Sequence, residues 1–270
     1  MTRTTRALAF LTAAVLLPAV ARGEEPRARD AARAAVARSA PALVTVRMTL
    51  KTRYVHEGRE GQEYERTLEV QGTVIAPDGL TVVSDLSTDP ESLFPPGADA
   101  QVETEASDVK LLLPAGEEVP ARFVLRDPDL DLAFLAPVAP RAPMPFLKLE
   151  KGGVPGQLDE LLVLTQLGPA LGREVAVQVG LVRAVVKRPR LFLVPALVEA
   201  HRAVGGPVLD TRGRPIGLVV FRRPPGGGGR ESFREQVAAI QPVVLTAADL
   251  LDVAAQAAAA RAEATAGRSP

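Results

Sequence analysis

Few side chains in this sequence of 270 residues could act as a nucleophile or a general base at neutral pH. Cysteine is absent, and the only two imidazoles belong to His56 and His201. His201 stands three residues before the phrase Val204-Gly205-Gly206-Pro207-Val208, a glycine turn that enters a short apolar run. Acyl transfer by serine needs a hydroxyl beside a base, and the residues around this turn include neither serine nor cysteine. The turn therefore lacks the nucleophile that a neighbouring histidine would activate.

Metal and nucleic-acid chemistry find little support in the composition. The two histidines are far apart, and the carboxylates are scattered without the spacing of a ligand set, so we expect no metal and no cofactor. Lys plus Arg and Asp plus Glu both number 32, so the chain has no basic field that would attract nucleic acid.

The first residues have the pattern of an export signal. A basic start at residues 1–6 precedes an apolar run at 7–17, which ends near Ala19-Val20-Ala21. The pattern predicts a signal peptide over 1–21 and a location in the periplasm or cell envelope of a bacterium. The run is shorter than the roughly 20 residues that cross a bilayer, so we expect no transmembrane helix in the mature chain, although a retained anchor is the alternative.

The sequence pattern predicts that most elements positioning a site are β-strands. Residues 42–50 alternate, with Val44, Val46, Met48 and Leu50 on one side, and residues 51–65 are charged, which predicts a polar hairpin tip. Residues 67–76 and 80–84 form a second hairpin around the turn Pro77-Asp78-Gly79. Strands at this spacing favour an all-β barrel or sandwich.

The second half begins after a proline-rich connector at 137–145 and continues with short strands to about residue 221. Thr246 and Asp249 then resemble a helix N-cap and its first turn. We expect this C-terminal helix to pack mainly on the second half of the protein. Its apolar face would consist of Leu250, Val253, Ala254 and Ala257.

The order of four segments resembles the protease domain of the HtrA (Deg) family of trypsin-like serine proteases. The strongest match is Gly205–Gly217, which resembles Gly-Gly-Pro-Leu-x-Asn-x-x-Gly-x-Val-Ile-Gly in that family. The hairpin at Gly72–Val83 and the run at Ala121–Leu135 also match, and Glu160–Val186 matches moderately. The resemblance covers nearly the whole predicted mature chain.

The resemblance also assigns the catalytic positions. The position of the family's catalytic aspartate is Asp131, whereas the histidine position is Leu86 and the serine position is Val204. The glycine that donates an oxyanion-hole amide is replaced by Arg202. We therefore expect no functional triad and interpret Asp131 as a residue that holds its loop by hydrogen bonds.

The fold implied by this resemblance is all-β, a trypsin-like double β-barrel with short N-terminal and C-terminal helices. The 28 residues after Pro242 are too few for the PDZ module that often follows this domain, so we expect none. The expected organisation is a signal peptide at 1–21 and a trypsin-like domain at 22–270, with barrels at about 40–137 and 148–242, a linker at 138–147 and a helix at 246–265.

The functional hypothesis is a pseudoprotease that binds a peptide or protein partner in the cell envelope. In the family, the segment aligned with Val237-Ala238-Ala239-Ile240 pairs with substrate backbone, so we expect a peptide-binding strand there. The alternative is an active serine hydrolase with a relocated base and a nucleophile such as Ser84 or Ser232. A third possibility is a regulatory subunit of an active family member, and a homo-oligomer is possible.

Overall fold

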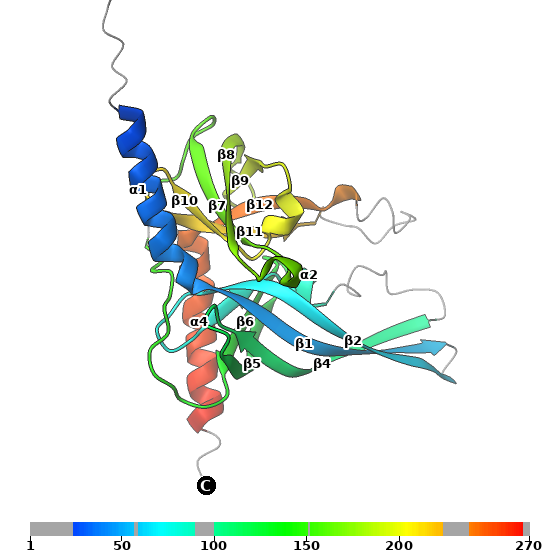
Figure 1. The fold of residues 1–270 in the computed structure, drawn as a ribbon. Coiled ribbons are helices and arrows are strands. Elements are labelled where there is room, and N and C mark those ends of the chain that lie inside the picture. Colours follow the sequence, from blue (N-terminus) through cyan, green and yellow to red (C-terminus); the bar gives the residue numbers. More distant parts are fainter. Residues whose placement is uncertain (1–23, 57–58, 90–99, 151, 224–237, 267–270) are drawn as a thin grey trace, which may run out of the picture.

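A computed structural model describes residues 24–56, 59–89, 100–150, 152–223 and 238–266. The predicted signal peptide, Ser232 and Val237 lie outside these ranges. The described chain folds into two closed, six-stranded antiparallel barrels (Figure 1). The predicted all-β double barrel is thus confirmed.

The first barrel has the strand order β1-β2-β3-β6-β5-β4. The alternating side chains predicted to share one side of β1 are all buried in its interior, which explains why this segment is a strand. Its strands are β1 (Leu43–His56), β2 (Arg59–Val74), β3 (Thr81–Val83), β4 (Ala100–Leu112), β5 (Glu118–Asp127) and β6 (Leu132–Pro137).

The second barrel has the strand order β10-β11-β12-β9-β8-β7. Its interior is filled by apolar side chains that include Val163, Val182 and Val244. Its strands are β7 (Glu160–Gln166), β8 (Val175–Val186), β9 (Phe192–Ala196), β10 (Pro207–Asp210), β11 (Pro215–Arg222) and β12 (Gln241–Thr246).

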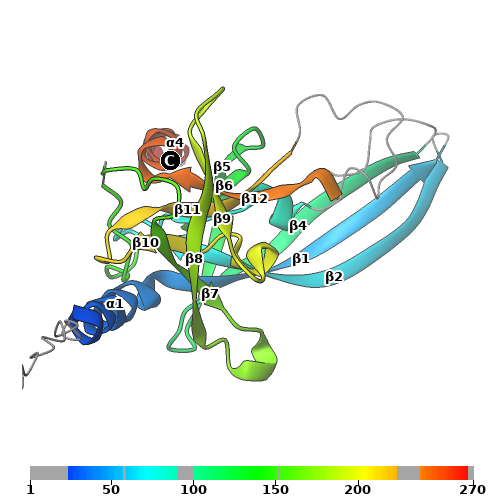
Figure 2. The same ribbon diagram turned by 90° about the horizontal axis from the view of Figure 1, so that it is seen from above.

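The charged segment at 51–65, predicted to be a polar hairpin tip, belongs to two long paired strands. β1 continues to His56 and β2 starts at Arg59, so that together with β4 they project from the first barrel (Figure 2). Charges of opposite sign face each other across the strands: Lys51 Nζ lies 2.6 Å from a carboxylate oxygen of Glu63. Composition predicted the hairpin tip but not the length of the paired strands that lead to it.

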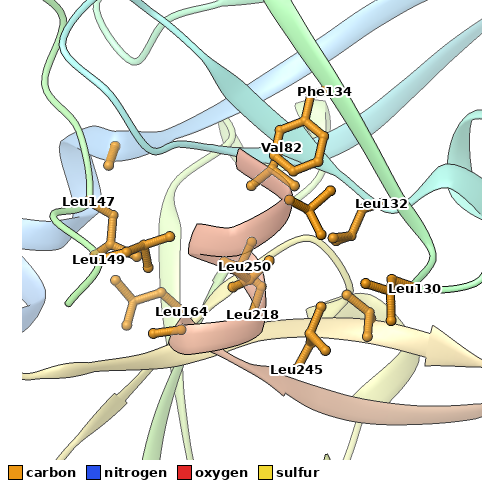
Figure 3. Close-up of a cluster of buried hydrophobic side chains, with 14 of the residues drawn as sticks. Val82, Leu130, Leu132, Phe134, Leu147, Leu149, Leu164, Leu218, Leu245 and Leu250 are labelled. Carbon is orange, nitrogen blue, oxygen red and sulfur yellow. The ribbon is translucent and has the colours of Figure 1, made fainter. Parts of the chain in front are cut away.

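The two barrels share one apolar cluster, and the C-terminal helix α4 (Ala247–Ala266) completes it (Figure 3). Leu250, Val253 and Ala257 of this helix are buried, as its predicted apolar face requires. The helix contacts β5 and β6 of the first barrel as well as β11 and β12 of the second. The expectation that it packs mainly on the second barrel was wrong, because its apolar face bridges both.

The remaining helices are short or peripheral. The helix α1 (Glu24–Ser39) lies against the second barrel, where Ala35 packs at Gly213 in the β10–β11 turn. The helix α2 (Asp85–Thr88) follows β3, and 3-10 turns occupy Ala40–Ala42 (η1), Pro169–Leu171 (η3) and Ala200–Ala203 (η4). Within the described ranges, every helix is too short or too polar to cross a membrane.

Candidate functional site

Asp131 lies where the two barrels meet, in the tight turn between β5 and β6. Its backbone has a positive φ of 58°, and its side chain is only 6% exposed. One carboxylate oxygen accepts the amide of Leu86 from the first barrel at 2.7 Å, and the other accepts the amide of Phe221 from the second at 2.6 Å. The Ser84 hydroxyl donates to both oxygens, at 2.9 and 2.8 Å. The carboxylate therefore links both barrels by hydrogen bonds.

The surroundings of Asp131 disfavour its charged form. Burial raises the pKa of Asp131 from 3.8 to about 6, the nearby charge of Asp85 adds to that increase, and the donated hydrogen bonds from Leu86, Phe221 and Ser84 oppose it. No cationic side chain hydrogen-bonds to the carboxylate among the described residues. An acid in a working triad stays ionised beside an imidazole, and this one lacks that partner.

Leu86 occupies the place beside Asp131 where the resemblance puts the histidine. It lies in α2, whose N-cap Ser84 accepts the amide of Ser87 at 3.1 Å, and an ion pair of Asp85 with Arg126 ties the helix to β5. The Leu86 side chain is 4% exposed and has no atom that can accept a proton. The structure thus brings Leu86 and Asp131 into direct contact.

The loop before β10 carries the other two substituted positions. Val204 is 7% exposed and packs in the apolar cluster of the second barrel. Gly205 has a φ of 82° and donates its amide to the carbonyl of Val219 at 2.8 Å. The amide of Arg202 donates to the carbonyl of Glu199 at 3.0 Å, within η4. That amide is therefore already engaged and does not point at an oxyanion position.

A hollow of about 360 Å³ lies beside this loop, between the barrels. Its wall includes Ser87 from α2, Val204, and Gly168 from the β7–β8 connection. Gln71 of β2 also lines it: its side-chain oxygen accepts the amide of Gln166, while its Nε2 is buried without a hydrogen-bond partner among the described residues. Gln71 therefore joins β2 to β7 at the wall of the hollow.

Gln71 and Gln166 are site residues that the sequence analysis missed. The Thr45 hydroxyl donates to the side-chain oxygen of Gln166 at 2.7 Å, so a chain of polar contacts joins β1, β7 and β2. The one sequence signal was the position of Gln71 immediately before Gly72, the start of a matched segment. An amide side chain in a strand carries no chemical signature of its own, so this signal was weak.

Of the residues proposed for the alternative, relocated site, Ser84 and His201 do not contact each other, and Ser232 lies outside the described residues. The ring of His201 lies 5.8 Å from the ring of Phe221, and among the described residues no serine hydroxyl hydrogen-bonds to it. Ser84 is bonded to Asp131 instead. The backbone of His56 lies at the far end of β1, opposite Arg59, and its side chain is outside the described atoms. No cluster of metal-ligating side chains occurs within the described ranges either.

Three of the four residues of the expected peptide-binding strand are described, and they form no strand, whereas Val237 lies outside the described residues. Ala238 and Ala239 are helical, Ile240 is buried outside any strand, and β12 begins only at Gln241. Pro242 in β12 and the small, helix-favouring alanines before it account for the late start. Backbone pairing with a ligand at Ala238 and Ala239 is therefore incompatible with this conformation.

Comparison with known proteins agrees with the double barrel. Two solved structures, titled "HtrA-type protease AlgWS227A with decapeptide" and the same protease "with tripeptide", superpose with TM-scores of 0.56 and 0.51 at 18% sequence identity. The alignments cover 82% and 81% of this chain but only 64% and 60% of those chains. No curated protein matches the sequence.

A sequence model of the family described as "Trypsin-like peptidase domain" matches residues 70–218, more than half of the chain. The matched region includes Leu86, Asp131, Arg202 and Val204. The chain is therefore a member of the trypsin-like peptidase domain family.

Proposed function

We propose that this protein binds an extended peptide or protein segment in the cleft between its barrels without hydrolysing it, in the cell envelope of a bacterium. The observation that carries the proposal is that Leu86, and not a histidine, contacts Asp131. In the loop before β10, the serine position is likewise occupied by the buried Val204. The fold keeps the cleft, and the side chains that would perform the reaction are replaced.

Serine proteolysis needs a base, a nucleophile and an oxyanion-hole amide, and each of the three is altered in this protein. Leu86 has no atom to accept a proton, and Val204 has no oxygen to attack a carbonyl. The Arg202 amide is bonded to Glu199, so it cannot stabilise an oxyanion without a change of conformation. Losing one member of a triad costs orders of magnitude in rate, and losing several leaves no pathway to an acyl-enzyme.

Binding does not need those side chains. The hollow beside Val204 is lined by residues of both barrels, among them Gln71 from the first barrel and Thr165 and Gly168 from the second. The two structures of a similar protease carry a decapeptide and a tripeptide in their titles, which supports an extended peptide as the ligand class. A segment without secondary structure exposes the backbone groups that such a ligand uses to bind.

The experiment is a fluorescence-anisotropy titration of fluorescein-labelled, unfolded casein with the purified chain, followed by electrophoresis of the casein. The matched variants are Gly168→Trp and Gly153→Trp. Neither glycine has a positive φ, and a Cβ at either position would meet no atom within 4 Å, so a side chain can start at either position without backbone strain or a clash at Cβ. Only Gly168 lines the hollow.

We expect the casein to bind and to stay intact, with at least a tenfold weaker affinity for Gly168→Trp and an unchanged affinity for Gly153→Trp. Cleavage of the casein by the purified chain, inhibited by a serine-directed fluorophosphonate, would instead support the relocated-nucleophile alternative. Equal weakening by both tryptophans would refute the hollow as the binding site.

A further inference from the structure

The strand β8 has an open edge on the second barrel. Its neighbour β9 pairs with it only from Leu181 to Val186, whereas β7 pairs with it from Val175 to Leu181. Over Val175–Gly180, no described strand pairs with β8 on the side away from β7. Among the described residues, barrel closure therefore leaves half of β8 with no strand on one hydrogen-bonding side.

The bonding pattern identifies the free backbone groups. At one end of β8, the carbonyl of Val182 accepts the amide of Leu158, and the amide of Val182 donates to the carbonyl of Asp159. At the other end, the carbonyl of Glu174 accepts the amide of Leu167. The even-numbered residues of β8 therefore form their backbone hydrogen bonds toward β7. The odd-numbered residues then direct their amides and carbonyls to the opposite side. The groups on the open edge belong to Val175, Val177 and Val179.

This edge lacks the protection that exposed strands usually have. From Val175 to Val182 the sequence contains no charged residue and no proline. Two of the edge side chains are exposed apolar surface, Val177 at 41% and Val179 at 66%. Gln178 between them has a buried side-chain oxygen with no hydrogen-bond partner among the described residues. Unprotected apolar edges are templates for pairing with another strand.

The geometry points to a second copy of this chain as the strand that covers the edge, paired antiparallel about a two-fold axis at Val177. In this register Val177 faces its own symmetry mate, and Val175 faces Val179 of the other copy, so each free residue meets another free residue. Three such pairs supply about six backbone hydrogen bonds, and valine lies opposite valine throughout.

A second copy is the occupant proposed because its own β8 edge carries the same free stretch and so matches it residue for residue. The free stretch has three bonding residues, and a two-fold axis at its middle residue uses all of them on both copies without leaving one unpaired. A register centred one residue later would place Val175 opposite Leu181, whose backbone already pairs with Ala196 of β9. The register at Val177 is therefore specified by the chain itself.

Single-cysteine cross-linking tests this arrangement, because the natural sequence has no cysteine. In a hydrogen-bonded antiparallel pair the two Cα atoms lie about 5.5 Å apart, within the range of a disulfide. Val177→Cys should therefore cross-link to a dimer under oxidised glutathione. Val179→Cys alone is the matched control, since its own mate would lie four residues further along the strand, about 14 Å away.

We expect most of Val177→Cys to become a covalent dimer at micromolar concentration and Val179→Cys alone to stay at the background level of collision. An equimolar mixture of Val175→Cys and Val179→Cys should cross-link, while each alone should not. No dimer from Val177→Cys, or equal yields from Val177→Cys and Val179→Cys, would overturn the inference. Its outcome is independent of peptide binding in the cleft.

Discussion

The buried carboxylate of Asp131 predicts an unusual dependence of stability on pH. Its pKa in the folded protein is raised to about 6 from 3.8, chiefly by burial. Between these two values the folded state holds a proton that the unfolded state has lost. The contribution of Asp131 to the free energy of unfolding is therefore largest below about pH 4, decreases as the pH rises to about 6, and is constant above that.

The size of this effect follows from linkage. One pH unit of pKa difference corresponds to 1.36 kcal/mol, so the difference between 3.8 and about 6 amounts to about 3 kcal/mol. The side chain is 6% exposed, so solvent does not screen the effect appreciably. The protonated acid can donate to the Ser84 hydroxyl while both of its oxygens still accept the amides of Leu86 and Phe221.

The assay compares urea unfolding of the unmodified chain and of Asp131→Asn at pH 4, 5, 6 and 7. Asparagine does not titrate, and all other groups cancel in the difference between the two proteins. We expect the stability advantage of the unmodified chain over Asp131→Asn to shrink by about 2 kcal/mol between pH 4 and pH 7, because part of the full effect of about 3 kcal/mol is already lost at pH 4. A difference that stays constant, or that grows as the pH rises, would refute this reasoning.

Two further predictions concern the loop before β10. Gly205→Ala should destabilise the protein by at least about 2 kcal/mol, because φ is 82° and the new Cβ would lie 2.3 Å from the carbonyl oxygen of Gln71. Thermal unfolding measures this loss, and Gly153→Ala is the control because its new Cβ would meet no neighbouring atom. The double variant Leu86→His, Val204→Ser should not react with a fluorophosphonate, whereas adding Arg202→Gly should start labelling by releasing the amide held by η4. Equal labelling of the double and triple variants would show that the Arg202 amide is not limiting.

Much of the architecture could be predicted from the sequence. The alternation of Val44, Val46, Met48 and Leu50 corresponds to the interior of the first barrel. The order of matched segments led to the prediction of a double barrel, and the structure places the Leu86 amide against the Asp131 carboxylate. Local periodicity and short motifs carry this kind of information, because each depends on a few neighbouring residues.

What the sequence could not predict depends on contacts between distant residues. Composition predicted a hairpin tip at 51–65, but not that β1 would extend to His56 and β2 begin at Arg59, with Lys51 paired to Glu63 across the two strands. The helix α4 bridges two barrels because the shared cluster has an apolar surface on both. The engagement of the Arg202 amide with Glu199 depends on one 3-10 turn, which no residue type specifies.

The central claim, that the cleft has lost covalent chemistry, is tested most directly by intact mass spectrometry of the purified chain after incubation with a fluorophosphonate. The absence of a nucleophile at Val204 and of a base at Leu86 predicts an unchanged mass, under conditions in which an active serine protease control is fully modified. An added mass of one phosphonyl group, mapped by peptide sequencing to a serine, would contradict the claim.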